Sequence, residues 1–136
     1  MKIVIVDYGM GNIPSIVSAI KHVGNNNVLV SDSAKELESD DRILLPGVGN
    51  FSQAMKIIQD KGLDDILSEL VLVRKKPILG ICLGMQLLGK SSTESGFREG
   101  LGFIDGKVER FTNSEIKIPH VGYNQVVTNK TSRLYK

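Results

Sequence analysis

The sequence predicts an α/β fold with a doubly wound, mostly parallel sheet that carries helices on both faces. Two observations predict this class. Four short runs are apolar on consecutive residues, as expected for parallel strands covered on both sides; they span residues 3–6, 28–30, 43–45 and 78–81. The segments between most of these runs carry apolar residues at helical spacing. The predicted order is therefore strand, helix, strand, strand, helix, strand, helix.

The first predicted helix spans residues 13–23. Its apolar residues are spaced by three, one, three and three positions, from Ile13 to Val23. Asn12 is a candidate N-cap, and Pro14 fits the first turn. His22 lies opposite the apolar stripe, so we expect it on a solvated face.

The second helical pattern begins at Phe51 and is interrupted at Gly62, where glycine weakens a helix. The same period resumes from residue 63 to residue 71, and residues 83–90 are predicted to form a further helix. Ligands of such sheets bind at the carboxyl ends of the strands. The loops that would gather there are residues 7–12, residues 46–50 and the turn at Cys82.

Beyond Lys90 the pattern changes to short elements separated by glycines. Residues 107–111 are a predicted strand and residues 121–127 a candidate second one, so we expect an antiparallel flap. Since no repeat or linker divides the chain, residues 1–136 are predicted to form a single domain.

Composition narrows the class of protein. The chain has 136 residues, 41% hydrophobic and 24% charged, as in soluble globular domains. The single cysteine excludes an internal disulfide and a cysteine-based zinc site, so we expect a reducing, cytoplasmic setting and no bound metal. The net charge is +2 with scattered basic residues, which argues against a nucleic-acid partner. The apolar run at residues 3–6 is too short for a signal peptide or a membrane span, so no membrane partner is expected.

The most informative motif is Gly80-Ile81-Cys82-Leu83-Gly84, which places the only cysteine between two glycines after a strand run. The pattern is typical of a nucleophile elbow, a strained strand-to-helix turn whose flanking positions have no room for side chains. A cysteine there lies at a helix N-terminus, where the macrodipole and free N–H groups favour the thiolate. On this motif alone, a buried structural cysteine beside ordinary turn glycines is an equal alternative.

A second motif, Leu45-Pro46-Gly47-Val48-Gly49, also follows a strand run and precedes a helix. Its glycines permit backbone conformations that aim N–H groups into the crevice. Together with the N–H of Leu83, the N–H groups of this loop could form an oxyanion hole for a tetrahedral intermediate. One alternative is a tight turn that needs glycine. A phosphate-binding loop is disfavoured, because the third glycine of that motif is missing.

Four segments together resemble a known family. They are Asp-Tyr-Gly-Met-Gly-Asn at 7–12, Pro-Gly-Val-Gly at 46–49, Gly-Ile-Cys-Leu-Gly-Met-Gln at 80–86 and Pro-His-Val-Gly-Tyr-Asn at 119–124. They occur in the order seen in class I glutamine amidotransferases. Segments 7–12 and 119–124 resemble most closely the glutaminase subunits of imidazole glycerol phosphate synthase. The resemblance spans the chain and implies the flavodoxin-like class I glutaminase fold.

The resemblance also implies an activity. Cys82 would attack the side-chain amide of L-glutamine, release ammonia and leave a glutamyl thioester that water hydrolyses. The backbone N–H groups of Val48, Gly49 and Leu83 would stabilise the oxyanion. Gly47, Gly49 and Gln86 would bind the substrate, although Gln86 could instead be an ordinary helix-surface residue. No cofactor is implied.

The resemblance further implies a partner. Asn12, His120, Tyr123 and Asn124 match positions that face a (β/α)8 barrel cyclase subunit of the HisF type. The ammonia would pass to that cyclase through a protected channel, for imidazole glycerol phosphate formation in histidine biosynthesis.

One expected element has no match in the sequence. The family takes its general base from a later His-x-Glu, but Cys82 is followed by a single histidine, His120, with no glutamate two positions on. We therefore expect a chain that is incomplete at its C-terminus and inactive alone. His120 as a substitute base is a weak alternative.

Three other functions stay open on the sequence alone. A relative without the base could act as a catalytically silent docking module for a synthase. A related amidotransferase subunit could serve sugar amidination in surface polysaccharide synthesis. A cysteine hydrolase or stress-response protein on a similar sheet is disfavoured by residues 7–12 and Gln86.

Overall fold

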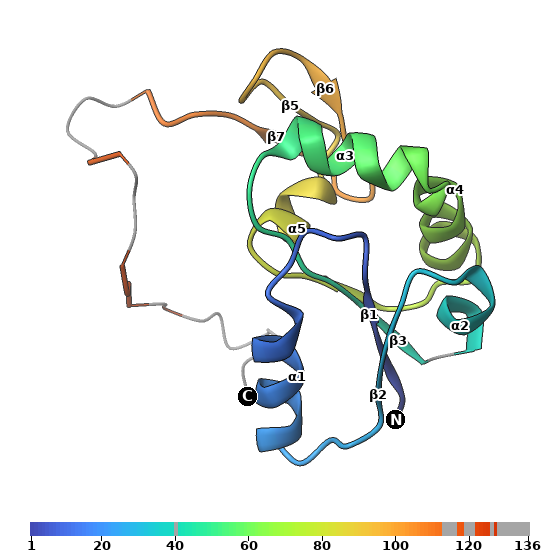
Figure 1. Ribbon diagram of the computed structural model, residues 1–136. Coiled ribbons are helices and arrows are strands. Elements are labelled where there is room, and N and C mark those ends of the chain that lie inside the picture. The colour runs from blue at the N-terminus through green and yellow to red at the C-terminus, as the bar shows by residue number, and fades with distance from the viewer. Residues whose placement is uncertain (40, 113–116, 119–121, 126, 128–136) are drawn as a thin grey trace.

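The computed structural model describes residues 1–39, 41–112, 117–118, 122–125 and 127. Its centre is a four-stranded sheet of β1 (Ile3–Val6), β2 (Val28–Ser31), β3 (Arg42–Leu45) and β4 (Ile78–Gly80), in the order β2-β1-β3-β4 (Figure 1). Ile3 lies opposite Val28 on one side and Arg42 on the other. All three strand pairings are parallel, which confirms the predicted sheet.

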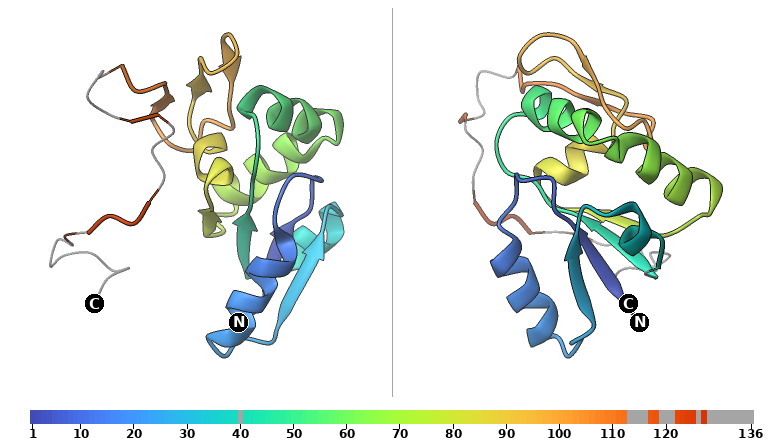
Figure 2. Two further views of the ribbon diagram at one scale, coloured as in Figure 1. Left: turned by 60° about the vertical axis from the view of Figure 1, so that its left-hand side comes forward. Right: turned by 45° about the vertical axis from the view of Figure 1, so that its right-hand side comes forward.

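Helices cover both faces of this sheet (Figure 2). On one face lies α1 (Ile13–His22), and on the other lie α2 (Ala34–Ser39), α3 (Phe51–Asp60) and α4 (Leu63–Ser68), which continues into the π-helical turn η1 (Glu69–Val73). Gly62 has a φ of 65°, a left-handed conformation that separates α3 from α4. The predicted break at this glycine is therefore confirmed.

The main core lies between the sheet and the α2–α4 layer. Alternate residues of β1 and β3 enter it, together with the apolar faces of the three helices; its members include Val4, Val6, Leu37, Ile43, Leu45, Phe51, Ala54, Met55, Ile58, Leu63 and Leu67. Ile5 and Leu44 are buried on the opposite face, on the side of α1. Both faces of these strands are thus covered, which is why their sequences are continuously apolar.

Two helix predictions need correction. The predicted order omitted α2, whose sequence Ala-Lys-Glu-Leu-Glu-Ser buries only Leu37 and has too little apolar periodicity to detect. Parallel strands need a crossover connection, and α2 provides it between β2 and β3. The helix predicted over 83–90 is the shorter α5 (Leu83–Leu87), since the backbone N–H of Lys90 instead donates to the carbonyl oxygen of Gly106 at 2.8 Å.

The flap prediction is correct in part. A small sheet of β5 (Ser91–Ser92), β6 (Arg98–Glu99) and β7 (Lys107–Val108) pairs β5 antiparallel to β6 but parallel to β7. Of the strand predicted over 107–111, only the first two residues pair. Residues 122–125 and 127 form no strand, and residues 121 and 126 lie outside the described part of the chain. No helix within the described residues is long and apolar enough to cross a membrane.

Candidate active site

Three loops meet at the carboxyl ends of neighbouring strands. Residues 7–12 follow β1, residues 46–50 follow β3, and Cys82 follows β4. Because β1, β3 and β4 are adjacent in the sheet, their following loops are neighbours as well (Figure 1). This is the arrangement that the sequence predicts.

Cys82 occupies a strained turn. Its φ of 55° and ψ of −116° are rare for a residue with a side chain, and its thiol is exposed. Its carbonyl oxygen accepts hydrogen bonds from the N–H groups of Met85 at 3.1 Å and Gln86 at 3.3 Å, which starts α5. A methyl group on Gly80 would lie 2.5 Å from the backbone nitrogen of Met85. The strand-to-helix turn therefore has the geometry of a nucleophile elbow.

The elbow is packed directly against the loop that follows β3. The N–H of Ile81 donates to the carbonyl oxygen of Leu45 at 3.0 Å. A methyl group on Gly84 would collide with the Leu45 carbonyl group and would lie 2.9 Å from the oxygen of Pro46. A methyl group on Gly47 would lie 2.6 Å from the backbone nitrogen of Gly84. These glycines allow the two backbones to pack in direct contact.

Backbone N–H groups without an acceptor in the described part of the chain lie next to the contact between the Cys82 elbow and the loop after β3. Within the described residues, the N–H groups of Val48, Gly49 and Leu83 have no hydrogen-bond acceptor. Gly49 has a φ of 103°, a conformation that a residue with a side chain rarely adopts. Val48 is half exposed, whereas Leu83 is buried. Unpaired N–H groups beside a nucleophile are the components of an oxyanion hole.

Tyr8 is buried next to the contact between the Cys82 elbow and the loop after β3. Its side chain is 1% exposed, and its hydroxyl donates a hydrogen bond to the carbonyl oxygen of Pro46 at 2.9 Å. Burial is the main cause, and the negative charge of a Cys82 thiolate the lesser one, that together raise the pKa of Tyr8 to about 12. The phenol is thus a permanent donor at physiological pH.

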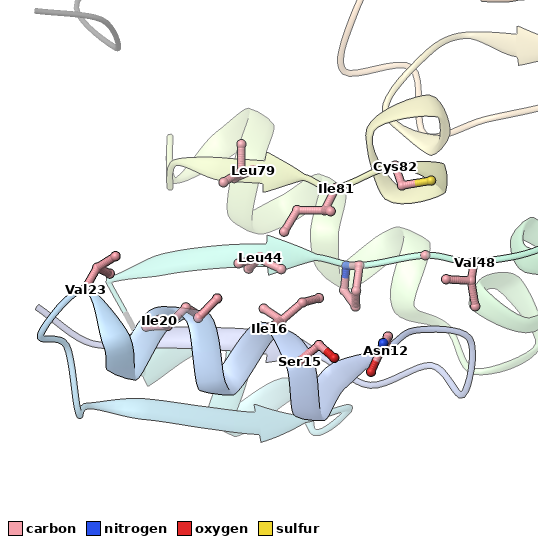
Figure 3. Close-up of a pocket in the computed structure, with 13 residues that line it drawn as sticks. Asn12, Ser15, Ile16, Ile20, Val23, Leu44, Val48, Leu79, Ile81 and Cys82 are labelled. Atoms are coloured by element: carbon pink, nitrogen blue, oxygen red, sulfur yellow. The ribbon is translucent and has the colours of Figure 1, made fainter. Parts of the chain in front are cut away.

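Cys82 lies at one end of a cavity of about 450 Å³ between α1 and the strands β3 and β4 (Figure 3). Val48 and Asn12 lie at the same end (Figure 3), and Gly47, which precedes Val48, lines the cavity as well, so the structure brings four predicted site residues together. The remaining length is lined by apolar side chains, among them Ile16, Ile20, Val23, Leu44, Leu79 and Ile81. Asn12 is the N-cap residue of α1, but its side chain makes no capping bond.

Gln86 lies apart from that cavity. It lines a second one, of about 390 Å³, together with Glu94 and Arg110. Sequence reasoning missed Glu94, which accepts hydrogen bonds from the N–H of Phe51 at 2.9 Å and from the side-chain amide of Asn50 at 3.2 Å. Glu94 therefore joins the flap to the start of α3. No local motif marks it, because its partners are more than 40 positions away in the sequence.

A comparison with known protein families matches residues 4–136 to glutamine amidotransferase class-I. The chain belongs to this family. Curated relatives agree: the chain is 48% identical over 136 residues to "Imidazole glycerol phosphate synthase subunit HisH 2" of Vibrio vulnificus. It is 45% identical over 135 residues to "Imidazole glycerol phosphate synthase subunit HisH 1" of Campylobacter jejuni. The matches cover 99% and 98% of this chain but 64% and 67% of those relatives, so the chain spans about two thirds of their length.

Solved structures support the fold of a class I amidotransferase. One titled "Crystal structure of glutamine amidotransferase" matches with a TM-score of 0.67 at 23% identity, covering 82% of this chain and 59% of that one. A putative peptidase E from Listeria monocytogenes matches with a TM-score of 0.59 at 16% identity, covering 76% of this chain and 63% of that one. At these identities the likeness concerns the fold alone.

Among the described residues, no histidine lies beside Cys82, the candidate nucleophile. His22 is exposed at the end of α1, as the sequence predicts, and His120 lies outside the described residues. Tyr123 and Asn124 are exposed, so the structure leaves their predicted role in partner binding open. Among the described residues, no group of three acidic, histidine or cysteine side chains could hold a metal ion.

Proposed function

We propose that this chain is the nucleophile-bearing part of a glutaminase that hydrolyses L-glutamine to glutamate and ammonia. The observation that carries the proposal is the strained elbow of Cys82, packed against a loop whose N–H groups at Val48 and Gly49 have no acceptor among the described residues. A nucleophile and unpaired donors in contact are the two requirements of acyl transfer.

In the proposed reaction, the Cys82 thiolate forms a bond to the side-chain amide carbon of glutamine. The carbonyl oxygen becomes an oxyanion, which the N–H groups of Val48, Gly49 and Leu83 stabilise. Collapse of this intermediate breaks the carbon–nitrogen bond, and the nitrogen leaves as ammonia after it gains a proton. Water then attacks the thioester carbon, which releases glutamate and restores the thiol.

We assign the amino-acid end of glutamine to the neighbourhood of Gln86 and Glu94, which line one cavity. A carboxylate suits the substrate ammonium, and an amide suits its carboxylate. Gly47 and Gly49 contribute backbone rather than side chains. With the amino-acid end bound there, the side-chain amide at the other end of the substrate would face Cys82.

The described residues supply no general base for the thiol of Cys82. His22 cannot serve, because it is exposed on α1 at the far end of the helix from Cys82. A His-x-Glu of the kind used by the family would complete the triad. Without it, we expect only residual turnover.

The partner that we propose is a (β/α)8 barrel cyclase of the HisF type, which uses the ammonia to form imidazole glycerol phosphate. The relatives described above are named as subunits of imidazole glycerol phosphate synthase, which supports this product. Asn12, Tyr123 and Asn124 are exposed and available for docking, and His120 belongs to the same sequence segment. The single thiol suits a cytoplasmic enzyme.

A second candidate rests on the numbers in the relatives' names. Both names carry a number, HisH 2 in Vibrio vulnificus and HisH 1 in Campylobacter jejuni. A duplicated subunit is free to serve another acceptor, such as a sugar in surface polysaccharide synthesis. Mixing the subunit with each candidate synthase and measuring glutamine-dependent product separates the two functions.

Labelling with a glutamine-derived chloroketone tests the nucleophile itself. Cys82 is the only cysteine, so peptide mapping should find the adduct on it, and Cys82→Ala should abolish labelling. An adduct on another residue, or equal labelling of Cys82→Ala, would exclude Cys82 as the nucleophile.

A further inference from the structure

Tyr8 connects all three loops of the site. It belongs to the loop after β1, its hydroxyl bonds the loop after β3, and its neighbours there touch the elbow. A methyl group on Gly47 would lie 2.8 Å from the Tyr8 oxygen, 2.8 Å from the Leu83 side chain and 2.6 Å from the Gly84 nitrogen. The phenol oxygen, the Gly47 backbone and the start of α5 therefore meet at one point.

The hydrogen bond from Tyr8 fixes one particular peptide group. The carbonyl of Pro46 and the N–H of Gly47 belong to the same rigid plane, so holding that oxygen also fixes the direction in which the chain leaves Pro46. The next two peptide groups carry the N–H groups of Val48 and Gly49. Glycine at 47 and 49 makes the loop intrinsically flexible, so an external anchor is needed to hold its donors in one orientation.

We infer that Tyr8 is a positioning residue, whose buried hydroxyl holds the Pro46–Gly47 peptide so that the following N–H groups face the carbonyl under attack by Cys82. The inference rests on the proposed glutaminase function. Tyr8 touches neither substrate nor thiol in this role; it acts through the loop.

The expected consequence of Tyr8→Phe follows from the geometry. The ring still fills the core, but the Pro46 oxygen loses its donor and the peptide is free to rotate. Small displacements of groups that stabilise a transition state can reduce rates by about 10². We therefore expect kcat to fall by about 10-fold to 10²-fold, with KM changed by less than about threefold, because the donors act on the transition state.

The experiment uses a fusion of this chain to the part of a relative's sequence that the chain does not match. We call this fusion the extended chain, and it is assayed with the proposed cyclase partner present. Ammonia release is measured for the wild type, Tyr8→Phe, Val48→Pro and the double variant. Val48→Pro removes one donor, so Tyr8→Phe should cost much less in that background than in the wild type. Ser39→Ala, which removes a hydroxyl that donates to Glu36 at 2.9 Å in α2, is the matched control and should leave kcat unchanged.

A second measurement needs no turnover. A glutamine-derived chloroketone forms an oxyanion when the thiol adds to its carbonyl, whereas iodoacetamide alkylates the thiol without one. Tyr8→Phe should slow labelling of Cys82 by the chloroketone at least about tenfold more than labelling by iodoacetamide. General unfolding would change both rates together.

The possible outcomes distinguish the proposed glutaminase function from the positioning role of Tyr8. A wild-type extended chain that releases no ammonia contradicts the proposed function. An active wild type whose Tyr8→Phe variant keeps its kcat and its ratio of labelling rates overturns the positioning role alone. Full additivity of Tyr8→Phe and Val48→Pro would also overturn it, since the two residues would then act independently.

Discussion

Gly84, the first residue after Leu83 in α5, packs against the carbonyl group of Leu45 so closely that a methyl group at Gly84 would collide with it. The contact joins the helix that follows Cys82 to the end of β3. It explains in physical terms why glycine follows Cys82 by two positions, since any side chain would push the elbow away from the loop at residues 46–49.

Gly84→Ala should therefore destabilise the protein strongly. Overpacking of a well-filled site commonly costs 1–3 kcal/mol, and contact with backbone rather than a movable side chain places this variant at about 3 kcal/mol or more. Gly106→Ala is the matched control, because a methyl group there meets nothing within 4 Å. Chemical denaturation measures both. Equal stability of the two variants would mean that the elbow and the loop are not in tight contact.

Raising the pH should destabilise the protein through Tyr8. Its pKa is raised from about 10 in the unfolded chain to about 12 in the folded protein. The unfolded chain therefore loses this proton first, so the stability contributed by the protonated phenol is present below about pH 10 and is lost as the pH rises towards 12. The loss is on the order of 2–3 kcal/mol.

Denaturant titrations between pH 8 and about pH 11 check this prediction. Tyr8→Phe should be less stable at pH 8 but should show a flatter decline above about pH 10. Tyr123→Phe, which changes an exposed ring, should leave the decline unaltered. If stability declined with the same slope in the wild type and both variants, the decline would come from titratable groups other than Tyr8.

Removal of one backbone donor should affect the rate rather than binding. Val48→Pro deletes an N–H that has no acceptor among the described residues, and in the extended chain it should lower kcat by about 10² to 10³ with a modest change in KM. Val48→Ala retains the N–H and should stay within about threefold of the wild type. Steady-state kinetics measure this effect. An unchanged kcat in a folded Val48→Pro protein would mean that the loop is an ordinary turn and not part of an oxyanion hole.

The sequence was sufficient for the sheet and for the elbow, because both depend on local patterns. Buried parallel strands are continuously apolar, and the elbow requires glycines at fixed distances from Cys82. The helix α2 could not be predicted, because a six-residue connection that buries one leucine is too short for a detectable period. Its existence follows only from the parallel pairing around it.

The candidate site also has one part that the sequence predicts and one part that it does not. Cys82 and the loop at 46–49 are marked by local motifs, and the structure brings them into contact. Glu94 and the anchoring bond of Tyr8 depend on partners about 40 positions away in the sequence, 38 for Tyr8 and 43 for the contact with Phe51, so no local pattern indicates them. Tyr8 belongs to the segment at residues 7–12 that resembles the family, but its buried hydrogen bond is a property of the fold.

Docking to the proposed cyclase partner should depend on exposed residues of the predicted docking surface, Asn12 and Tyr123. Asn12→Lys and Tyr123→Glu should each weaken association at least about tenfold, about 1.4 kcal/mol, because a charge would be buried at the interface. Stability should change by less than about 0.5 kcal/mol, since both side chains are exposed. Ser18→Lys on the exposed surface of α1 is the control. Calorimetric titration that gave one affinity for all four proteins would remove these residues from the docking surface.

Ammonia release from L-glutamine by the extended chain, with partner present and Cys82→Ala as the comparison, tests the role of Cys82 most directly. Loss of a nucleophile commonly reduces kcat by about 10⁴ to 10⁶, so Cys82→Ala should be inactive at the limit of a sensitive assay while remaining folded. The same assay on the 136-residue chain should give only residual turnover, because its described residues place no histidine to act as the general base. A Cys82→Ala protein that retained activity within about tenfold of the wild type would contradict nucleophilic catalysis by Cys82, since tenfold is only ~1.4 kcal/mol of barrier.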